Sequence, residues 1–288
     1  MSFQHILIVY NPAAQGGKSH KLLNAYETIL KQESLNYTLY ETSGESDSIV
    51  IRQLIQENTV DLISVVGGDG TINTTINGLP SFDIPLHFIP AGTGNDLIKM
   101  IYSTSPLEEI LKKPITYQGT QSIDIWRCNE KRFVNGFGAG FDGAIAHETQ
   151  YKTFLFSSKT KYWIAIIKHI LFYTSPTLLI NGEKKSTFML SAANGKVYGG
   201  GFKIAPDAVV DDGYLELVHC QRINFLKRLY YLPLVISGKH IGKKAIWNEK
   251  LTELKIVSSH PLPAHLDGEP IHENTYHIFL EANVEVIS

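Results

Sequence analysis

Three glycine-containing turns in the first part of the chain have the composition of phosphate-binding loops. They span residues 11–18, 67–73 and 90–96, and each lies between an apolar strand pattern and a helical pattern. Such a turn presents backbone N–H groups at a helix N-terminus, where an anion is held best. The carboxylate of Asp69 lies inside the second turn and would repel phosphate. We therefore expect a metal ion, a water molecule or a ribose between the two.

Two acidic loops in the second part of the chain are candidates for metal binding and proton transfer. Residues 199–214 combine glycines with acidic side chains, and a tight loop with carboxylates and free carbonyls can hold Mg²⁺ or Ca²⁺. In residues 266–270, Asp267 and Glu269 flank a glycine, and either could accept a proton from a hydroxyl that attacks phosphate. Ordinary turns account equally well for both loops at this point.

Several other chemistries have no matching pattern. The glycine turns fit neither the Walker A motif nor the Gly-x-Gly-x-x-Gly dinucleotide fingerprint. The sequence has no His-x-x-x-His or Cys-x-x-Cys spacing, which argues against zinc. Ser64 does not lie in a Gly-x-Ser-x-Gly elbow, which argues against a hydrolase triad.

Composition and length indicate a globular protein of one large or two ordinary domains. The chain has 288 residues, 43% of them hydrophobic and 19% charged, and its two cysteines fit a reducing compartment. Residues 1–10 read as a first strand and lack the regions of a signal peptide. No apolar run reaches the roughly 18 residues that span a bilayer. We expect a cytoplasmic protein that makes peripheral contact with the inner membrane surface.

The net charge of −2 conceals an asymmetry between the two parts of the chain. Residues 1–120 carry a net charge of −5 and residues 121–288 a net charge of +3. An acidic, glycine-rich part suits a metal-bound nucleotide, and a mildly basic part suits an anionic membrane surface. The excess of positive charge is too small to argue for nucleic acid.

The order of strand and helix patterns predicts an α/β fold with two domains. Residues 1–120 alternate strands with helices, which predicts an N-terminal doubly wound parallel sheet. Residues 121–288 predict a C-terminal β-rich antiparallel domain with three helical pieces, near 143–151, 161–172 and 225–237. All three glycine turns then lie at the carboxyl ends of parallel strands, where ligands of open α/β sheets bind. We expect the active site in the cleft between the domains.

At this point the motifs resemble those of the diacylglycerol kinase catalytic family, in its soluble bacterial lipid kinase branch. The resemblance rests on residues 11–12, 67–73 and 90–96, and on 199–201, 206–215 and 267–269 in the second part, all in family order. Gly-Gly-Asp-Gly alone is shared with NAD kinases and phosphofructokinases, whereas the full set is specific. The resemblance covers essentially the whole chain and implies the two-domain kinase fold of that family.

The resemblance also implies roles for individual residues. It implies an ATP site that consists of Asn11, Pro12, Ala13, Ala14, Gln15, Thr42, Gly67, Gly68, Asp69, Gly70, Thr71, Ile72, Asn73 and Thr93. It implies a structural Mg²⁺ held by Asp212 and by carbonyls near Val209 and Tyr214. Asp69, Asp96 and Asp124 would form a carboxylate–water network around a catalytic Mg²⁺. Either Asp267 or Glu269 would be the catalytic base.

Two positions depart from the family pattern. Lys99 stands where the family commonly has arginine, so the positive charge is kept and the bidentate fork is lost. Thr74 follows Asn73 where an acidic residue is common in the family. Neither change removes a core catalytic group, and both could tune activity or substrate choice.

The expected function is transfer of the γ-phosphoryl group of ATP to a lipid hydroxyl, of diacylglycerol or a related lipid. The alternatives are a kinase for NAD or another soluble metabolite, and a non-catalytic regulator that binds nucleotide or lipid. The aromatic and lysine-rich stretch 159–173 would suit a membrane interface or a lipid cleft, although burial explains such a helix more often. Sheet edges in the second domain would allow a homodimer. The sequence does not identify the lipid.

Overall fold

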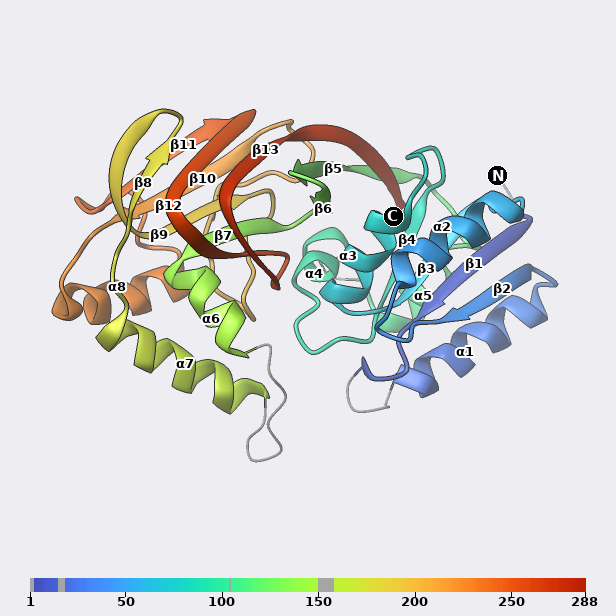
Figure 1. The fold of residues 1–288 in the computed structure, drawn as a ribbon. Coiled ribbons are helices and arrows are strands. Elements are labelled where there is room, and N and C mark those ends of the chain that lie inside the picture. The colour runs from blue at the N-terminus through green and yellow to red at the C-terminus, as the bar shows by residue number, and fades with distance from the viewer. Residues whose placement is uncertain (1–2, 15–18, 104, 150–157) are drawn as a thin grey trace. The chain divides into compact units, whose positions relative to one another are not determined.

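The computed structural model describes residues 3–14, 19–103, 105–149 and 158–288, which form two compact units (Figure 1). The first unit is Met1–Ile125 together with Glu281–Ser288, and the second is Trp126–Leu280. The expected boundary fell between residues 120 and 121. The last eight residues return to the first unit, which the order of elements along the chain gives no reason to expect.

The first unit is a doubly wound parallel sheet, as predicted. Its strands are β1 His5–Tyr10, β2 Asn36–Glu41, β3 Leu62–Gly67 and β4 Leu86–Pro90, and its helices are α1 Ser19–Gln32, α2 Asp47–Glu57, α3 Asp69–Gly78, α4 Asp96–Ile101 and α5 Leu107–Lys112. The strands lie in the order β4-β3-β1-β2, all parallel. Val286 near the C-terminus pairs in parallel with Leu86 and extends this sheet beyond β4.

Burial explains why the central strands read as continuous apolar runs. All six residues of β3 are buried, and so are the last five of β1. Helices cover both faces of a parallel sheet of this kind, so neither face of a central strand meets water. Tyr26 of α1 reaches the buried Ser64 of β3 through a hydrogen bond of 2.7 Å, which ties one layer of helices to the sheet.

The second unit is mostly antiparallel, also as predicted. Its elements are β6 Lys131–Phe133, β7 Gly136–Gly140, α6 Phe141–Thr149, α7 Ser158–Phe172, β8 Thr177–Ile180, β9 Glu183–Ala193, β10 Leu215–Gln221, α8 Phe225–Ser237, β11 Ile246–Leu251 and β12 Glu253–Leu266. Strands β5 (Thr120–Cys128) and β13 (Glu269–Ile287) begin in one unit and end in the other. The main strand order in the second unit is β11-β10-β9-β7-β12-β13.

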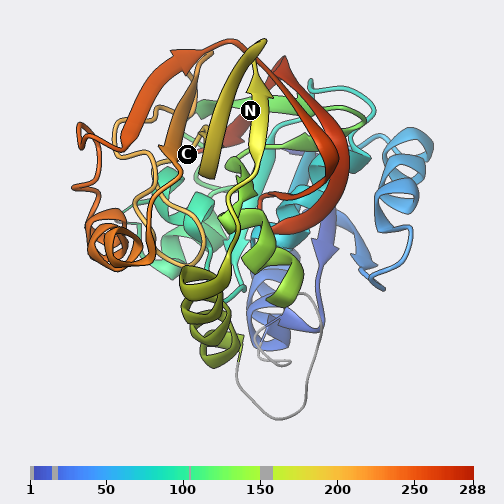
Figure 2. The ribbon, with the colours of Figure 1, turned by 60° about the vertical axis from the view of Figure 1, so that its left-hand side comes forward.

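Two apolar clusters lie on opposite faces of β9 and β10. One joins Leu190, Leu215 and Leu217 to strands β12 and β13, and it includes the fully buried Trp126. The other cluster consists of side chains on the opposite face of the same strands, such as Val218, which pack against the three helices. Figures 1 and 2 show α6, α7 and α8 together on this face. Within the described residues, no helix is both long and apolar enough to cross a bilayer.

Candidate functional site

The turns that follow β1, β3 and β4 meet at one edge of the parallel sheet. The N–H of Asn11 donates to the carbonyl of Val66 at 3.1 Å, and the N–H of Ala91 donates to the carbonyl of Gly67 at 2.9 Å. Because these bonds continue the strand pairing beyond the last strand residues, the three turns start at the same level. This confirms the expectation that they share the carboxyl edge of the sheet.

Two of the turns approach each other backbone to backbone. A Cβ atom added to Gly92 would lie 2.4 Å from the Cα of Gly68, and one added to Gly68 would lie 2.8 Å from the Cα of Gly92. Any side chain at either position would collide with main chain, which cannot move aside as a flexible side chain can. The two glycines are therefore required for the contact between the turns.

The carboxylate of Asp69 links the same two turns. Its oxygens accept hydrogen bonds from the N–H groups of Asp96 and Leu97, at 3.3 and 3.4 Å. Asp69 begins α3 and Asp96 begins α4, so one acidic side chain reaches across to the start of the next helix. The apolar pattern predicts a helix from Ile72. In the structure α3 begins about one turn earlier, at Asp69, because Gly68 already serves as its N-cap.

Asn95 and Lys99 hold the third turn in its shape. The side chain of Asn95 accepts from the N–H of Gly92 at 2.9 Å and donates to the carbonyl of Gly92 at 2.8 Å. Asn95 itself has a left-handed backbone, with φ of 54°, which asparagine tolerates better than most residues. The ammonium group of Lys99 donates to the carbonyl of Gly94 at 2.6 Å. A point charge suffices for this contact, so the arginine that the resemblance implied at this position is not required for it.

The remaining predicted nucleotide residues follow the ends of β1, β2 and β4. The side chain of Asn11 donates to the Thr71 hydroxyl at 3.2 Å and accepts from the N–H of Ala13 at 2.9 Å. The N–H of Thr42 donates to the carbonyl of Tyr10 at 2.8 Å, which places Thr42 beside the end of β1. Thr93 is exposed. Gln15 lies outside the described residues.

The acidic side chains of this edge have the chemistry of a magnesium site. A Cβ added to Gly94 would lie 3.0 Å from Oδ2 of Asp69 and 3.8 Å from Oδ2 of Asp96, so both carboxylates border the same small space. Asp124 is buried in β5 of the same unit. No group of three or more acidic, histidine or cysteine side chains in the described parts of the chain could enclose a metal. Two carboxylates fit an Mg²⁺ that keeps waters and shares substrate phosphates.

In the second unit, Asp267 is a structural anchor of the turn between β12 and β13. Its carboxylate accepts hydrogen bonds from the N–H groups of Val134, Asn135 and Gly136, at 3.0, 2.8 and 2.9 Å. Its own N–H donates to the carbonyl of Gly136 at 2.9 Å. Its backbone is left-handed, with φ of 51°. These contacts fix Asp267 on the β6–β7 turn and occupy both of its carboxylate oxygens.

Glu269 has the opposite surroundings. It is exposed and begins β13, two residues after the anchored Asp267. A base must reach the proton that it accepts, and an exposed carboxylate next to a rigid turn meets that requirement better than one held by three N–H groups. The sequence left the choice between Asp267 and Glu269 open, and the hydrogen bonds favour Glu269.

In the predicted magnesium loop, the carboxylate of Asp212 is paired with the ammonium group of Lys250. Lys250 donates to Oδ2 of Asp212 at 2.6 Å, and the N–H of Tyr214 donates to Oδ1 at 3.1 Å. The hydrogen bond to Asp212 raises the pKa of Lys250. Both oxygens of this carboxylate are therefore engaged, and a magnesium ion bound there has to displace the ammonium group.

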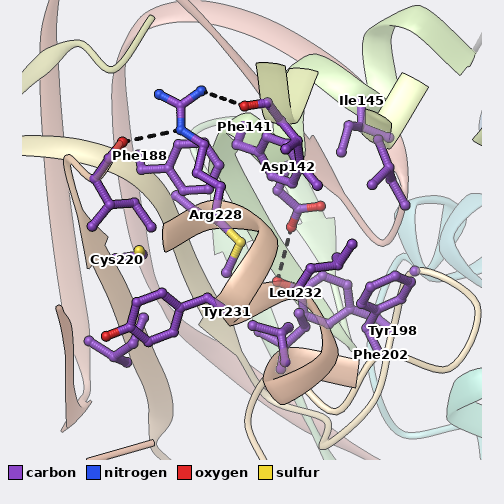
Figure 3. A pocket seen from close by; sticks show the side chains of 18 of the residues that line it. Phe141, Asp142, Ile145, Phe188, Tyr198, Phe202, Cys220, Arg228, Tyr231 and Leu232 are labelled. Carbon is purple, nitrogen blue, oxygen red and sulfur yellow. Dashed lines mark hydrogen bonds between the residues drawn. The ribbon is translucent and has the colours of Figure 1, made fainter. Parts of the chain in front are cut away.

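The second unit contains an apolar pocket, of which the sequence analysis predicted only one wall, through the lipid cleft suggested for residues 159–173. It has a cavity volume of about 60 Å³ and lies among α6, α7, α8 and strands β9 and β10, with Phe141, Ile166, Phe188, Phe202 and Leu232 in its wall (Figure 3). Asp142 and Arg228 are its charged members. Residues this far apart in the sequence meet only through the fold, so no local pattern predicts them.

Arg228 joins the two helices that border the pocket. Its guanidinium group donates to the carbonyl of Ile170 near the end of α7 at 2.9 Å and to the carbonyl of Ile223 at 3.2 Å (Figure 3). It also lies over the Phe188 ring, 4.5 Å from the ring centre. The last carbonyls of a helix lack partners within the helix, so this arginine completes α7 while it closes one side of the pocket.

Comparison with family profiles identifies both parts of the chain. The diacylglycerol kinase catalytic domain matches residues 5–128, and the YegS C-terminal NAD kinase beta sandwich-like domain matches residues 136–283. The chain belongs to the diacylglycerol kinase family. The resemblance and the two-domain α/β fold expected from the sequence are thereby confirmed.

Individual members of the diacylglycerol kinase family match over nearly the whole chain. The diacylglycerol kinases of Staphylococcus carnosus and Bacillus subtilis are each 26% identical over 274 residues, which is 91% of this chain and 87% and 88% of theirs. A crystal structure of a diacylglycerol kinase from Bacillus anthracis covers 100% of this chain and 97% of its own, with a TM-score of 0.71 and 21% identity. A second structure from that organism gives a TM-score of 0.76 at 23% identity. These structures support the fold.

The different surroundings of Asp267 and Glu269 predict different effects on stability. We expect Asp267→Asn to lower the free energy of unfolding by about 1–3 kcal/mol, because an amide cannot accept from all three N–H groups and leaves a donor unpaired. Glu269→Gln should change it by less than about 0.5 kcal/mol, since the residue is exposed. Denaturant unfolding of the two variants measures both values. Equal losses in the two variants would contradict the anchoring role of Asp267.

Proposed function

We propose that this chain is an ATP-dependent lipid kinase that transfers the γ-phosphoryl group of ATP to a lipid hydroxyl. The observation that carries the proposal is the bond of Asp69 to the start of α4, which joins two phosphate-type turns and leaves two carboxylates beside Gly94. Membership of the diacylglycerol kinase family gives the class of acceptor. Diacylglycerol is the acceptor that the relatives' names suggest.

The first unit would bind the nucleotide. The backbone N–H groups at the start of α3 have no partner within the helix and would meet phosphate oxygens. Asn11, Thr42 and Thr93 would contact other parts of ATP. Asp69 and Asp96, together with Asp124 of β5, would hold a hydrated Mg²⁺. When bound, this ion would neutralise charge on the phosphates, which is the main requirement of phosphoryl transfer.

Glu269 would act as the base. As the lipid hydroxyl oxygen forms a bond to the γ-phosphorus, the bond from that phosphorus to the β-phosphate oxygen breaks and ADP leaves. The hydroxyl proton passes to the Glu269 carboxylate. Asp267 would hold the turn that carries Glu269, through its three N–H donors.

The apolar pocket of the second unit would receive part of an acyl chain. Its wall is almost entirely aliphatic and aromatic, with Asp142 as its acidic member and Arg228 bound to helix carbonyls. Apolar side chains bind a hydrocarbon chain by removing both surfaces from water. The small volume of about 60 Å³ suits the end of a chain rather than a whole lipid.

Helices α7 and α8 would rest on an anionic membrane surface. Helix α8 contains no buried residue, and its Leu226 and Tyr230 are 63% and 59% exposed. On α7, Ile167 and Phe172 are 57% and 77% exposed. Residues 221–248, which include α8, contain six lysines and arginines and no acidic residue. Exposed apolar side chains within a basic segment are typical of helices that lie in a lipid interface. We propose a cytoplasmic enzyme with peripheral membrane contact on this face.

The two carboxylates with catalytic roles predict loss of turnover in folded protein. We expect Asp69→Asn and Glu269→Gln each to lower kcat at least about 100-fold, through lost charge stabilisation and lost proton acceptance respectively. The melting temperature should stay close to that of the unchanged protein in Glu269→Gln. It should fall modestly in Asp69→Asn, because the amide can accept from only one of the two N–H groups at the start of α4. Asp83→Asn, an exposed acid of the first unit, is the control and should retain full turnover. Either catalytic variant with full turnover would overturn its assigned role.

The loop of Val209, Asp212 and Tyr214 would hold a structural Mg²⁺ in competition with Lys250. We expect millimolar Mg²⁺ to raise the melting temperature, because an ion that binds only the folded state stabilises it. The rise should be larger in Lys250→Met, which removes the competing cation, and absent in Asp212→Asn. Differential scanning calorimetry with and without Mg²⁺ measures these shifts. An equal rise in Asp212→Asn would place the stabilising ion elsewhere.

The proposed membrane face predicts a matched pair of effects on vesicle binding. The double change Phe172→Ser and Leu226→Ser should weaken binding to phosphatidylglycerol vesicles by about tenfold or more, since each side chain loses its apolar burial in the lipid. Ile49→Ser, which removes a residue 58% exposed on α2, should have no effect. Cosedimentation measures the binding. Unchanged vesicle binding together with a lower mass in analytical ultracentrifugation would show that the face forms a homodimer instead.

A further inference from the structure

The turn that carries Glu269 is held at a second point besides Asp267. The N–H of Gly268 donates to Nδ1 of His265 at 3.2 Å. His265 is buried on β12, with an exposed fraction of 4%, and precedes the turn by two residues. Gly268 has a φ of 92°, which lies in the left-handed region that glycine adopts without strain. The hydrogen bond from Gly268 fixes that turn against a rigid strand.

The other nitrogen of His265 faces a buried acid. Nε2 lies 3.1 Å from Oδ2 of Asp142, at the start of α6. Because Nδ1 accepts from Gly268, the proton of the neutral ring is on Nε2 and is donated to Asp142. Asp142 thereby selects the tautomer that leaves Nδ1 free to accept. This is the arrangement by which an acid orients a histidine in many polar networks.

The network continues to the wall of the apolar pocket. The Tyr198 hydroxyl donates to the same oxygen of Asp142 at 3.2 Å, and Ser191 is hydrogen bonded to Tyr198. Burial, and then the charge of Asp142, raise the pKa of Tyr198 well above its usual value, so the hydroxyl keeps its proton. Both Asp142 and Tyr198 line the pocket. The network is therefore continuous from the Glu269 turn to the proposed acyl site.

Gly138 shows how tightly this network is packed. A Cβ added to Gly138 would lie 2.3 Å from Oδ2 of Asp142 and 2.3 Å from Nε2 of His265. Strand β7, which carries Gly138, pairs with His265 directly in the antiparallel register. A glycine is the only residue that leaves room for the histidine–carboxylate contact across this strand pair.

We propose that His265 is a positioning residue for the phosphoryl transfer, with Asp142 fixing its tautomer so that Nδ1 holds the turn of Asp267, Gly268 and Glu269. The inference rests on the proposed function, in which Glu269 accepts the hydroxyl proton. His265 exchanges no proton with the substrate. Its effect is on the placement of the Glu269 carboxylate, and a displacement of about 1 Å in such a group can cost about 100-fold in rate.

Two substitutions at position 265 separate positioning from packing. Asn in place of His265 offers its Oδ1 near the position of Nδ1 and can still accept from Gly268. Gln offers its Nε2 near the position of the ring Nε2, so it can still donate to Asp142 and loses the acceptor for Gly268. We expect His265→Gln to lower kcat about 10- to 100-fold with an unchanged KM for ATP. We expect His265→Asn to keep most of the turnover.

The control is a buried histidine of the same unit that does not contact the turn. His219 is 5% exposed and is bonded to Thr187 at 3.0 Å. His219→Gln removes comparable packing and should leave kcat unchanged. A purely structural role for His265 predicts equal losses of melting temperature and of turnover in His265→Gln and His265→Asn. That result, or full turnover in His265→Gln, would overturn the proposal.

A second readout does not depend on catalysis. Amide hydrogen exchange at Gly268, followed by NMR, should be faster in His265→Gln than in the unchanged protein and slow in His265→Asn. Protection of Gly268 in His265→Gln would show that the histidine does not hold the turn and would overturn the inference. Failure of the unchanged protein to phosphorylate any lipid would instead reject the proposed function, and the Gly268 exchange would still decide whether His265 holds the turn.

Discussion

The close approach of Gly68 and Gly92 is the constraint on which the first unit's site depends. The main chains of the turns after β3 and β4 are in direct contact at these two glycines. A side chain at either position would force the turns apart. The carboxylate of Asp69 accepts from the N–H groups at the start of α4. An acid that would be unfavourable in a plain phosphate loop thereby becomes a link between two loops and a neighbour of Asp96.

In the second unit, hydrogen bonds to neighbouring residues fix the position of the turn that carries the exposed carboxylate of Glu269. Glu269 is exposed, so its position depends on the residues on either side of it. Asp267 ties the turn to residues 134–136, and His265 ties it through Gly268 to Asp142. Both ties use charged or polar groups bonded to backbone N–H groups, which are directional and stronger in a buried setting than in water. A flexible loop could not hold the carboxylate of a base in one position in the same way.

The sequence predicted that the three glycine turns share one edge of the sheet, because the signals for these turns are local. Each glycine turn directly follows an apolar strand in the sequence. Strands β1, β3 and β4 are almost entirely buried, so each appears in the sequence as an apolar run. The spacing of Ile51, Leu54 and Ile55 predicts a helix over residues 47–57, and α2 has these bounds, Asp47–Glu57. A pattern of a few adjacent residues predicts local structure reliably when those same residues form the turn or helix.

What the sequence did not predict depends on pairing between distant residues. Strand β11 (Ile246–Leu251) was missed because it is short and largely exposed. The apolar pattern predicts two short strands, 276–280 and 284–287, because Glu281 and Asn283 interrupt it. In the structure β13 is continuous: it pairs with β12 as far as Phe279, and it also pairs with β5 and β4. The different surroundings of Asp267 and Glu269 depend on N–H groups more than 130 residues away in the sequence. The apolar pocket draws on six elements, α6, α7, α8, β9, β10 and β11.

Transfer of radiolabel from ATP is the most direct test of the central claim. The protein is incubated with Mg²⁺, ATP labelled at the γ-phosphate and vesicles that contain diacylglycerol, monoacylglycerol, phosphatidylglycerol or ceramide. The products are then separated by organic extraction and thin-layer chromatography. We predict a labelled lipid that forms only with Mg²⁺ and only with vesicles or detergent present. Label that remains in ATP or passes only to water-soluble acceptors such as NAD would contradict the account.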